Sequence, residues 1–168
     1  MMTLVIGGAA SGKSEYAERH VLSLDGERVY LAVMEPFGSE AAARIEKHRQ
    51  RRAGRGFRTI ERPTDLAGLT GIRDANVLLE DLPNLMANEI FSERGGGKDA
   101  VLAGLRHLKN EARHLTIVTG DLMSDGIRYP EETDRYLRDL AEAAIAVAAE
   151  ADLVVEVVCG LPNILKGR

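Results

Sequence analysis

The sequence of 168 residues has no tryptophan, one cysteine and few aromatic residues, which make up 4% of the chain. The single Cys159 excludes a disulfide within the chain, so an apolar core must hold the fold together. No charged-then-apolar leader and no long uncharged apolar run is present, which argues against a secretory signal or a membrane helix. We therefore expect a single domain over residues 1–168, acting in the cytoplasm and without a membrane partner.

Positive charge is scarce except in one stretch of the chain. The net charge is −4, yet residues 44–58 alone carry +6, so the remainder is at about −10. A chain that is acidic elsewhere is a poor general partner for nucleic acid, and we expect no nucleic-acid partner. The basic stretch is expected to serve one local anion site, which suits a small-molecule substrate.

Short apolar runs rich in β-branched residues alternate with segments of helical composition. This order is typical of an α/β fold with a mainly parallel sheet, and runs that are almost wholly apolar indicate strands covered on both faces. The expected strands are residues 4–6, 29–33, 77–79, 116–119 and 153–158. The expected helices are residues 12–22, 39–52, 83–91, 98–114 and 131–150.

A glycine-rich loop follows the first apolar run and leads into the first helix. Its residues are Gly7, Gly8, Ala9, Ala10, Ser11, Gly12, Lys13 and Ser14. Glycines at both ends let the backbone N–H groups converge where the helix N-terminus attracts anions. Lys13 then reaches the outer phosphates of a nucleotide, and the Ser14 hydroxyl is a ligand for Mg²⁺. The pattern predicts binding of a nucleoside triphosphate; the alternative is a turn that only joins strand to helix.

Acidic residues end the apolar run at residues 77–79. Glu80 and Asp81 follow it directly, at the point where phosphate-loop enzymes place a carboxylate that holds Mg²⁺. Either carboxylate suits this role, with the Ser14 hydroxyl as the other metal ligand. The competing interpretation is a solvent-facing acid at the end of a strand.

The basic stretch places a histidine among arginines on an expected helix. His48 follows Arg44 by four residues and precedes Arg51 and Arg52 by three and four, so all four share one helical face. Cationic neighbours favour the neutral, nucleophilic form of the imidazole and bind polyphosphate. The spacing alone equally fits a solvated basic surface with an incidental histidine.

Several segments together resemble one enzyme family along most of the chain. They are residues 7–14, residues 43–49 with Arg52, residues 57–61, residues 78–81 and residues 160–162. The family is that of the bifunctional adenosylcobinamide kinases and adenosylcobinamide-phosphate guanylyltransferases of cobalamin biosynthesis. The resemblance implies a P-loop NTPase-like fold of the RecA type, a three-layer α/β sandwich with a mainly parallel sheet.

The resemblance also implies roles for particular residues. The family's histidine that becomes covalently guanylylated falls on His48. Its acidic position falls on Glu80, which the resemblance makes the first choice for the Mg²⁺ ligand, while the role of Asp81 stays open. Lys13 is then the other catalytic residue. The nucleotide-binding set comprises the loop residues together with Arg44, Arg49, Arg51, Arg52 and Glu61. The implied substrates are GTP or ATP and a cobinamide-type corrinoid, with Mg²⁺ as cofactor, and the implied assembly is a homo-oligomer, expected to be a trimer.

The sequence departs from the family pattern in three places. Gly120 and Asp121 stand where asparagine and glutamate are usual, residues 38–41 replace a common Asp-Asp-Glu-Met, and the last helix carries Glu142, Ile145 and Ala146 at usually polar or glycine positions. Two alternatives therefore stay open: a kinase without guanylyl transfer, and a non-catalytic nucleotide-binding regulatory module. Whether the kinase step uses ATP or GTP, and which corrinoid is accepted, are also open.

Three further histidines carry no expected chemistry. His20 lies on the first expected helix, and His107 and His114 lie on the helix expected over residues 98–114. We expect surface or packing roles for them. The histidines are scattered and only one cysteine is present, so no recognisable zinc-binding spacing occurs.

Overall fold

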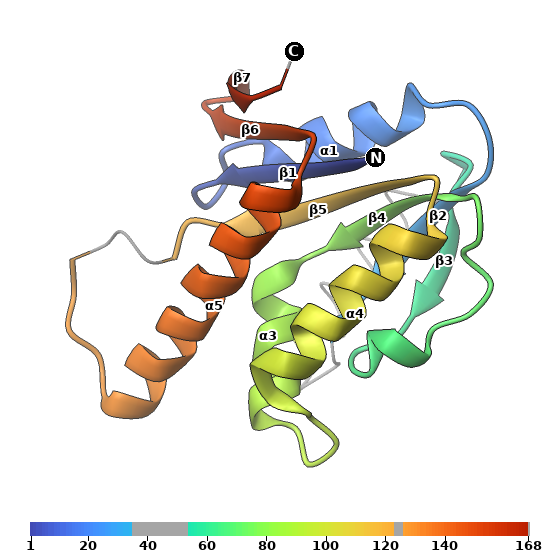
Figure 1. Ribbon diagram of the computed structural model, residues 1–168. Helices are drawn as coiled ribbons and strands as arrows, with labels where there is room; N and C mark the ends of the chain where they lie inside the picture. The colour runs from blue at the N-terminus through green and yellow to red at the C-terminus, as the bar shows by residue number, and fades with distance from the viewer. Residues whose placement is uncertain (35–53, 123–125, 168) are drawn as a thin grey trace.

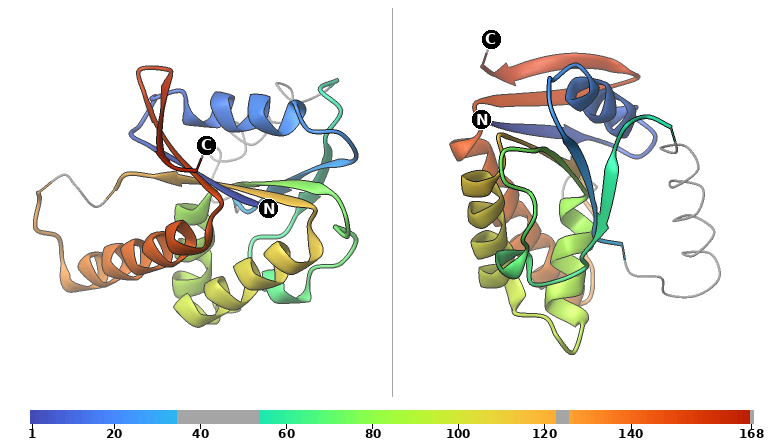
Figure 2. Two further views of the ribbon diagram at one scale, coloured as in Figure 1. Left: turned by 45° about the horizontal axis from the view of Figure 1, so that its top comes forward. Right: turned by 90° about the vertical axis from the view of Figure 1, so that its right-hand side faces the viewer.

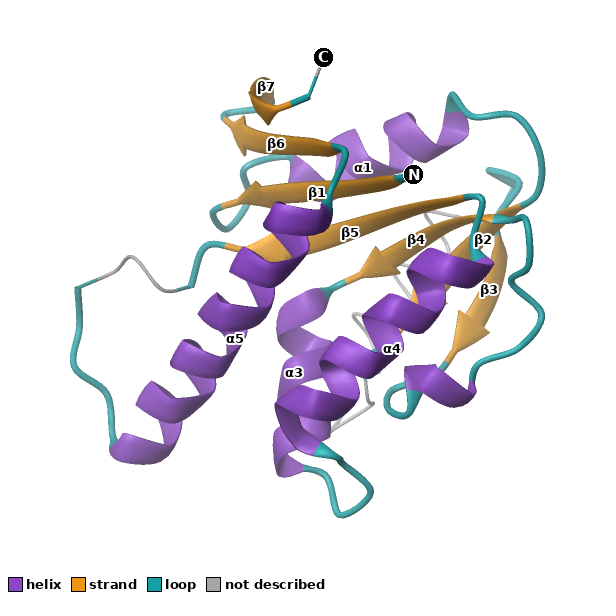
Figure 3. Ribbon diagram, in the orientation of Figure 1, coloured by secondary structure: helices purple, strands orange, loops and turns teal. Residues whose placement is uncertain are grey.

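The computed structural model describes residues 1–34, 54–122 and 126–167, which alternate strands with helices as expected (Figures 1 and 3). The strands are β1 (Met2–Gly7), β2 (Arg28–Ala32), β3 (Arg58–Glu61), β4 (Asn76–Glu80), β5 (His114–Gly120), β6 (Leu153–Val158) and β7 (Leu161–Lys166). The helices are α1 (Lys13–Leu22), α3 (Leu82–Phe91), α4 (Gly97–Glu111) and α5 (Glu131–Glu150), with a short 3₁₀ helix η1 (Leu66–Gly68). The helix expected over residues 39–52 lies outside the described residues.

One sheet of seven strands organises the described chain, in the order β3-β2-β4-β5-β1-β6-β7. All neighbouring strands from β3 to β6 run parallel, and only β7 pairs antiparallel, with β6. The expectation of a mainly parallel α/β sheet is therefore confirmed.

Helices cover both faces of this sheet, which makes three layers. Figure 2 shows α1 on one face and α3, α4 and α5 on the other. Strand β4 explains how both faces become apolar: Val77 and Leu79 belong to the larger core cluster, while Leu78 belongs to the smaller cluster against α1. Successive side chains of a strand point to opposite faces, so a strand between two helical layers must be apolar throughout.

The expected helix over residues 98–114 is wrong at its end. Helix α4 stops at Glu111, and His114 opens β5 opposite Asn76 of β4. The chain turns extended at Ala112, and Arg113 donates its backbone N–H to the carbonyl of Ala75 at 2.9 Å. Pairing with the sheet thus ends the helix before its sequence pattern does.

The parallel arrangement brings the carboxyl ends of several strands to one edge of the sheet. Gly7 at the end of β1 is in register with Gly120 at the end of β5, and Ile6 is in register with Glu156 of β6. Glu80 ends β4 and is in register with Ala32 of β2. Loops that leave this edge are therefore the ones that assemble a site.

Candidate active site

The glycine-rich loop joins the end of β1 to the start of α1 and has no room for side chains at either end. A Cβ on Gly7 would lie 2.5 Å from the Ser11 hydroxyl and 2.7 Å from the carbonyl of Val157. Gly12 caps the N-terminus of α1 with a φ of 91°, a value that glycine adopts without strain. The two bracketing glycines predicted from sequence are thus required by the geometry of the loop.

A turn from the other end of the chain supports this loop. Residues Cys159 and Gly160 connect β6 to β7, both with positive φ, at 50° and 78°. This is the backbone form of tight two-residue hairpins. The N–H of Gly160 donates to the carbonyl of Ser11 at 2.8 Å, and its Cα would lie 3.2 Å from a Cβ on Gly12. The views of Figure 2 show the hairpin beside the start of α1.

Lys13 lies over the loop at the first turn of α1. Its ammonium group donates to the carbonyl of Gly8 at 3.1 Å and is exposed to solvent. A surface hollow of about 230 Å³ is lined by Ala10, Ser11, Gly12, Lys13, Ser14, Glu15 and Glu18. The hollow combines the N-terminus of a helix with a lysine, and these two features attract phosphate groups.

The acidic end of β4 lies near this lysine. The hydroxyl of Tyr30 donates to Oε2 of Glu80 at 2.8 Å, which orients that carboxylate from the neighbouring strand β2. Asp81 caps α3 and accepts hydrogen bonds from the backbone N–H and side-chain amide of Asn84. Burial raises the pKa of Asp81, and Glu80 raises it further, whereas the two bonds from Asn84 and the charge of Lys13 lower it.

Glu61, predicted to contact nucleotide, ends β3 and is exposed. It is in register with Ala32 of β2, and Ala32 is in register with Glu80 on its other side. The carboxylates of Glu61 and Glu80 therefore belong to the same edge of the sheet. Strands β2, β4 and β5 separate Glu61 from β1, however, so the sheet does not place Glu61 beside the glycine-rich loop, which is also called the phosphate loop below.

The basic residues predicted around the nucleophile lie outside the described residues. They are Arg44, His48, Arg49, Arg51 and Arg52. The chain is described again from residue 54, and it returns close to the loop. Arg55 donates to Oε2 of Glu18 at 2.6 Å, and Glu18 lines the hollow beside Lys13 and is only 11% exposed. The end of the basic stretch is therefore anchored to the helix that carries the loop.

Two of the positions that depart from the family pattern lie beside the loop. Gly120 is in register with Gly7, and the backbone N–H of Asp121 donates to the carbonyl of Gly7 at 3.2 Å. Gly120 has no side chain, so the side-chain amide that the family usually places at this position is missing from β5.

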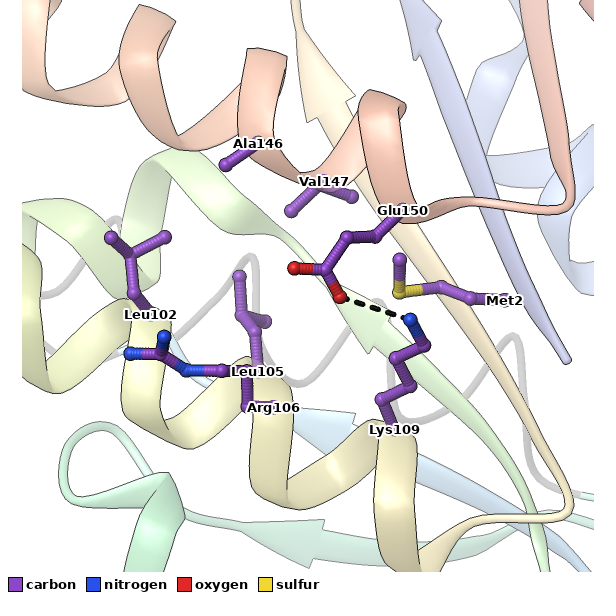
Figure 4. Close-up of a pocket in the computed structure, with 8 residues that line it drawn as sticks. All are labelled: Met2, Leu102, Leu105, Arg106, Lys109, Ala146, Val147 and Glu150. Carbon is purple, nitrogen blue, oxygen red and sulfur yellow. Dashed lines mark hydrogen bonds and ion pairs between the residues drawn. The ribbon is translucent and has the colours of Figure 1, made fainter.

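The three residues of α5 that depart from the family pattern lie away from the glycine-rich loop. Ile145 is 69% exposed, and Glu142 forms an ion pair with Lys98. Ala146 lines a hollow of about 90 Å³ between α4 and α5, whose wall includes Met2 at the amino end of β1 and an ion pair of Lys109 with Glu150 (Figure 4). The phosphate loop leaves β1 at its opposite end, so this hollow is separate from the loop.

Oxygen ligands are the only metal-binding groups that the described part of the site offers. Ser14 and Glu80 supply a hydroxyl and a carboxylate, the hard donors that Mg²⁺ prefers. Across residues 1–34, 54–122 and 126–167, no group of three or more His, Cys, Asp or Glu residues is placed to hold a metal ion. The helices within these ranges include none long and apolar enough to cross a membrane.

The fold is that of the P-loop NTPase-like α/β sandwiches of the RecA type, and the glycine-rich loop lies at the carboxyl edge of the mainly parallel sheet. The sequence comparisons narrow this class. The chain belongs to the family described as cobinamide kinase / cobinamide phosphate guanyltransferase, whose model matches residues 3–165.

Named relatives agree with this assignment. The chain is 30% identical to the bifunctional adenosylcobalamin biosynthesis protein CobP of Pseudomonas aeruginosa, over 100% of its own length and 99% of that protein. It is 42% identical to CobU of Escherichia coli over 103 residues, which cover 59% of the chain and 55% of that protein. Among solved structures, flagellar accessory protein FlaH of Methanocaldococcus jannaschii matches with a TM-score of 0.53 and 12% identity, covering 99% of this chain and 78% of that one. The FlaH match shows the fold alone.

Proposed function

We propose that this protein phosphorylates adenosylcobinamide with a nucleoside triphosphate and transfers GMP from GTP to adenosylcobinamide phosphate through a guanylyl-histidine intermediate. The family match over residues 3–165 supports both reactions. The single observation that carries the proposal is the glycine-rich loop, where Lys13 donates to the carbonyl of Gly8 and the hairpin turn supports the backbone through the N–H of Gly160.

In the kinase step, the loop N–H groups and Lys13 hold the outer phosphates while the cobinamide hydroxyl oxygen attacks the terminal phosphorus. The bond from this phosphorus to the bridging oxygen breaks, the nucleoside diphosphate leaves, and the hydroxyl proton passes to solvent. Ser14 and Glu80 are the proposed ligands of Mg²⁺, which when bound would neutralise charge on the transferring phosphoryl group. Tyr30 keeps the Glu80 carboxylate turned in one direction through its hydrogen bond of 2.8 Å. Positioning and charge neutralisation supply most of the rate in such transfers.

In the guanylyl transfer, a nitrogen of His48 forms a bond to the α-phosphorus of GTP and pyrophosphate leaves. A phosphate oxygen of cobinamide phosphate then attacks the same phosphorus, and the imidazole leaves. Arg44, Arg49, Arg51 and Arg52 are proposed to bind the phosphates, and Glu61 is proposed to contact the nucleotide. Dividing the transfer into two substitutions at one phosphorus lowers each barrier.

A kinase without guanylyl transfer is the second candidate. Gly120 favours it, because it leaves β5 without the family's usual amide directly beside Gly7. On this alternative, the loop and Glu80 act as proposed, and His48 never carries GMP.

Intact mass spectrometry tests the proposal. Wild type, His48→Ala and Lys13→Ala are each incubated with GTP and Mg²⁺ without any corrinoid. We expect one added GMP on wild type, labile in acid, and none on His48→Ala. Lys13→Ala is expected to bind GTP weakly and to form little adduct, because the loop loses its cation.

A second assay adds cobinamide and follows phosphate transfer from the triphosphate. Phosphorylation without any GMP adduct would select the kinase-only candidate. Tight GTP binding with neither adduct nor phosphorylated cobinamide would overturn both enzymatic proposals and leave the regulatory module.

A further inference from the structure

A second group of polar side chains gathers at the edge of the sheet opposite the phosphate loop. Thr3 lies near the amino end of β1, His114 is the first residue of β5, and His20 lies in the last turn of α1. Thr3 and His114 are 1% and 7% exposed, while His20 is partly exposed. The proposed catalytic reactions use none of these residues.

The three polar atoms converge on one point. Nε2 of His20 and Nε2 of His114 are 3.4 Å apart, and the hydroxyl oxygen of Thr3 lies 2.9 Å from the His114 nitrogen and 3.4 Å from the His20 nitrogen. The two rings meet at a steep angle of 64° with their centres 5.2 Å apart, so they present their nitrogens to each other and are not stacked.

This nitrogen–nitrogen distance equals the spacing that a shared metal ion requires. A hydrogen bond from a ring N–H spans about 2.7–3.2 Å between heavy atoms. Two imidazoles on one tetrahedral zinc ion, each at about 2.0–2.1 Å, place their nitrogens about 3.4 Å apart. The observed 3.4 Å is a long hydrogen-bond contact and also equals the distance between two imidazole nitrogens on zinc, whereas the 2.9 Å between the Thr3 hydroxyl and Nε2 of His114 is an ordinary hydrogen bond.

We propose that His20 and His114 bind one divalent transition-metal ion through their Nε2 atoms, with Zn²⁺ as the best fit. The Thr3 hydroxyl, which is hydrogen-bonded to Nε2 of His114 at 2.9 Å in this structure, would turn to a metal-bound water when the ion occupies that nitrogen. Water completes the coordination on the exposed side of His20. Imidazole nitrogens suit Zn²⁺, Ni²⁺ and Cu²⁺ and do not suit Mg²⁺, so this site is chemically separate from the oxygen ligands Ser14 and Glu80.

Burial disfavours the charged form of both rings. Burial lowers the pKa of His20. Burial, followed by the nearby His20 and the N-terminal ammonium group, lowers the pKa of His114 to about 4, against a smaller opposing effect of Asp152.

A metal ion at this point would tie α1 to the central strands β1 and β5. Helix α1 carries Lys13 and Ser14 at its other end, so the link would restrain the helix that positions the phosphate loop. Because the ion would bind the folded chain and not the dispersed ligands of the unfolded chain, it would raise the stability of the fold.

Isothermal titration with Zn²⁺, in excess Mg²⁺ to fill oxygen sites, tests the proposal. The background carries His48→Gln, which removes the histidine outside the described residues. We expect one tight equivalent, and His20→Gln, at the partly exposed ligand, should weaken binding by about tenfold or more. The matched control is His107→Gln on α4, whose ring contacts the carbonyl of Leu69 at 2.7 Å, and it should bind as the background does.

Two further readouts separate a metal site from a merely structural cluster. Zn²⁺ should raise the melting temperature of the background protein and not that of His20→Gln, and it should shift the NMR signals of both Nε2 atoms. Thr3→Val, which keeps the shape of the side chain, should weaken Zn²⁺ binding less than His20→Gln does. Equal Zn²⁺ affinity in the background and in His20→Gln, or no binding at all, would overturn the proposal.

Discussion

At the scale of single residues, buried carboxylates and amides connect loops that the sequence does not link. Glu89 is 2% exposed on α3, and its two oxygens accept from the backbone N–H groups of Asp65 at 2.7 Å and Gly96 at 2.8 Å. The neighbouring Asn88 donates to the carbonyls of Val33 and Pro63. Together they hold both the segment before η1 and the turn before α4 to one helix.

Glu89→Gln should destabilise the fold by about 1–3 kcal/mol, because its amide turns a donor toward one of two backbone donors. Urea unfolding monitored by circular dichroism measures this loss. Glu93→Gln, an exposed change in the same region, is the control and should stay within about 0.5 kcal/mol of wild type. Equal losses of unfolding free energy in the two variants would show that the buried hydrogen bonds of Glu89 do not stabilise the fold.

The residues of the phosphate loop were predictable because that pattern is local. Eight consecutive positions supply the glycines, the lysine and the hydroxyl, and the preceding strand and following helix confirm their setting. Tyr30 and Gly160 were not predicted, because each reaches the site from a distant segment through one hydrogen bond. The pair of His20 and His114 escaped for the same reason, since the two residues are 94 positions apart.

At the scale of elements, the sequence pattern predicted the helices α1, α3, α4 and α5 and the central strands, but it did not predict two edge strands. Strand β3 has only four residues, mostly exposed, and β7 is exposed along its whole length and contains Pro162. Edge strands bury little, so they lack the apolar run that marks a central strand. The opposite error occurs at His114: the sequence pattern predicted helix up to this residue, whereas the chain already pairs with the sheet there.

Contact between α4 and η1 gives a prediction at this scale. Gly104 lets the two elements meet, because a Cβ at this position would lie 2.7 Å from the Cβ of the buried Leu66. Gly104→Ala gains about 1 kcal/mol of helix propensity but incurs about 1–3 kcal/mol from overpacking. The clash joins two atoms next to the backbone, so we expect a net loss of about 1 kcal/mol or more.

Thermal melting of Gly104→Ala against wild type measures this balance. The matched control is Asn110→Ala, an exposed change on the same helix that gains propensity without any clash. A higher melting temperature for Gly104→Ala would mean that η1 moves away freely and that the contact is weak.

At the scale of the whole molecule, the sheet exposes apolar side chains to solvent along its β7 edge. Leu161, Ile164 and Leu165 of β7 are 72%, 55% and 58% exposed, and Val158 at the end of β6 is 52% exposed. Isolated exposed apolar residues are ordinary, but several along one edge strand favour coverage by another chain. These side chains add to the expectation of a homo-oligomer that the family resemblance raised.

Light scattering coupled to gel filtration should therefore give a mass above that of one chain, with a trimer expected. Leu161→Arg should shift the population toward smaller species if this edge takes part in the assembly. Arg106→Leu, on the exposed side of α4, is a control that should leave the mass unchanged. A monomeric wild type at working concentration would refute the expected assembly.

The hairpin contact with the phosphate loop also sets the order in which the molecule becomes competent during synthesis. Residues 7–14 leave the ribosome early, yet β1 pairs only with β5 and β6, and the loop receives its last hydrogen bond from Gly160. A nascent chain that stops short of β6 therefore holds the complete sequence motif without the backbone that shapes it. Nucleotide capture should begin only after Gly160 has been synthesised and has reached the loop, so a motif that is contiguous in sequence depends on a residue about 150 positions further along the chain.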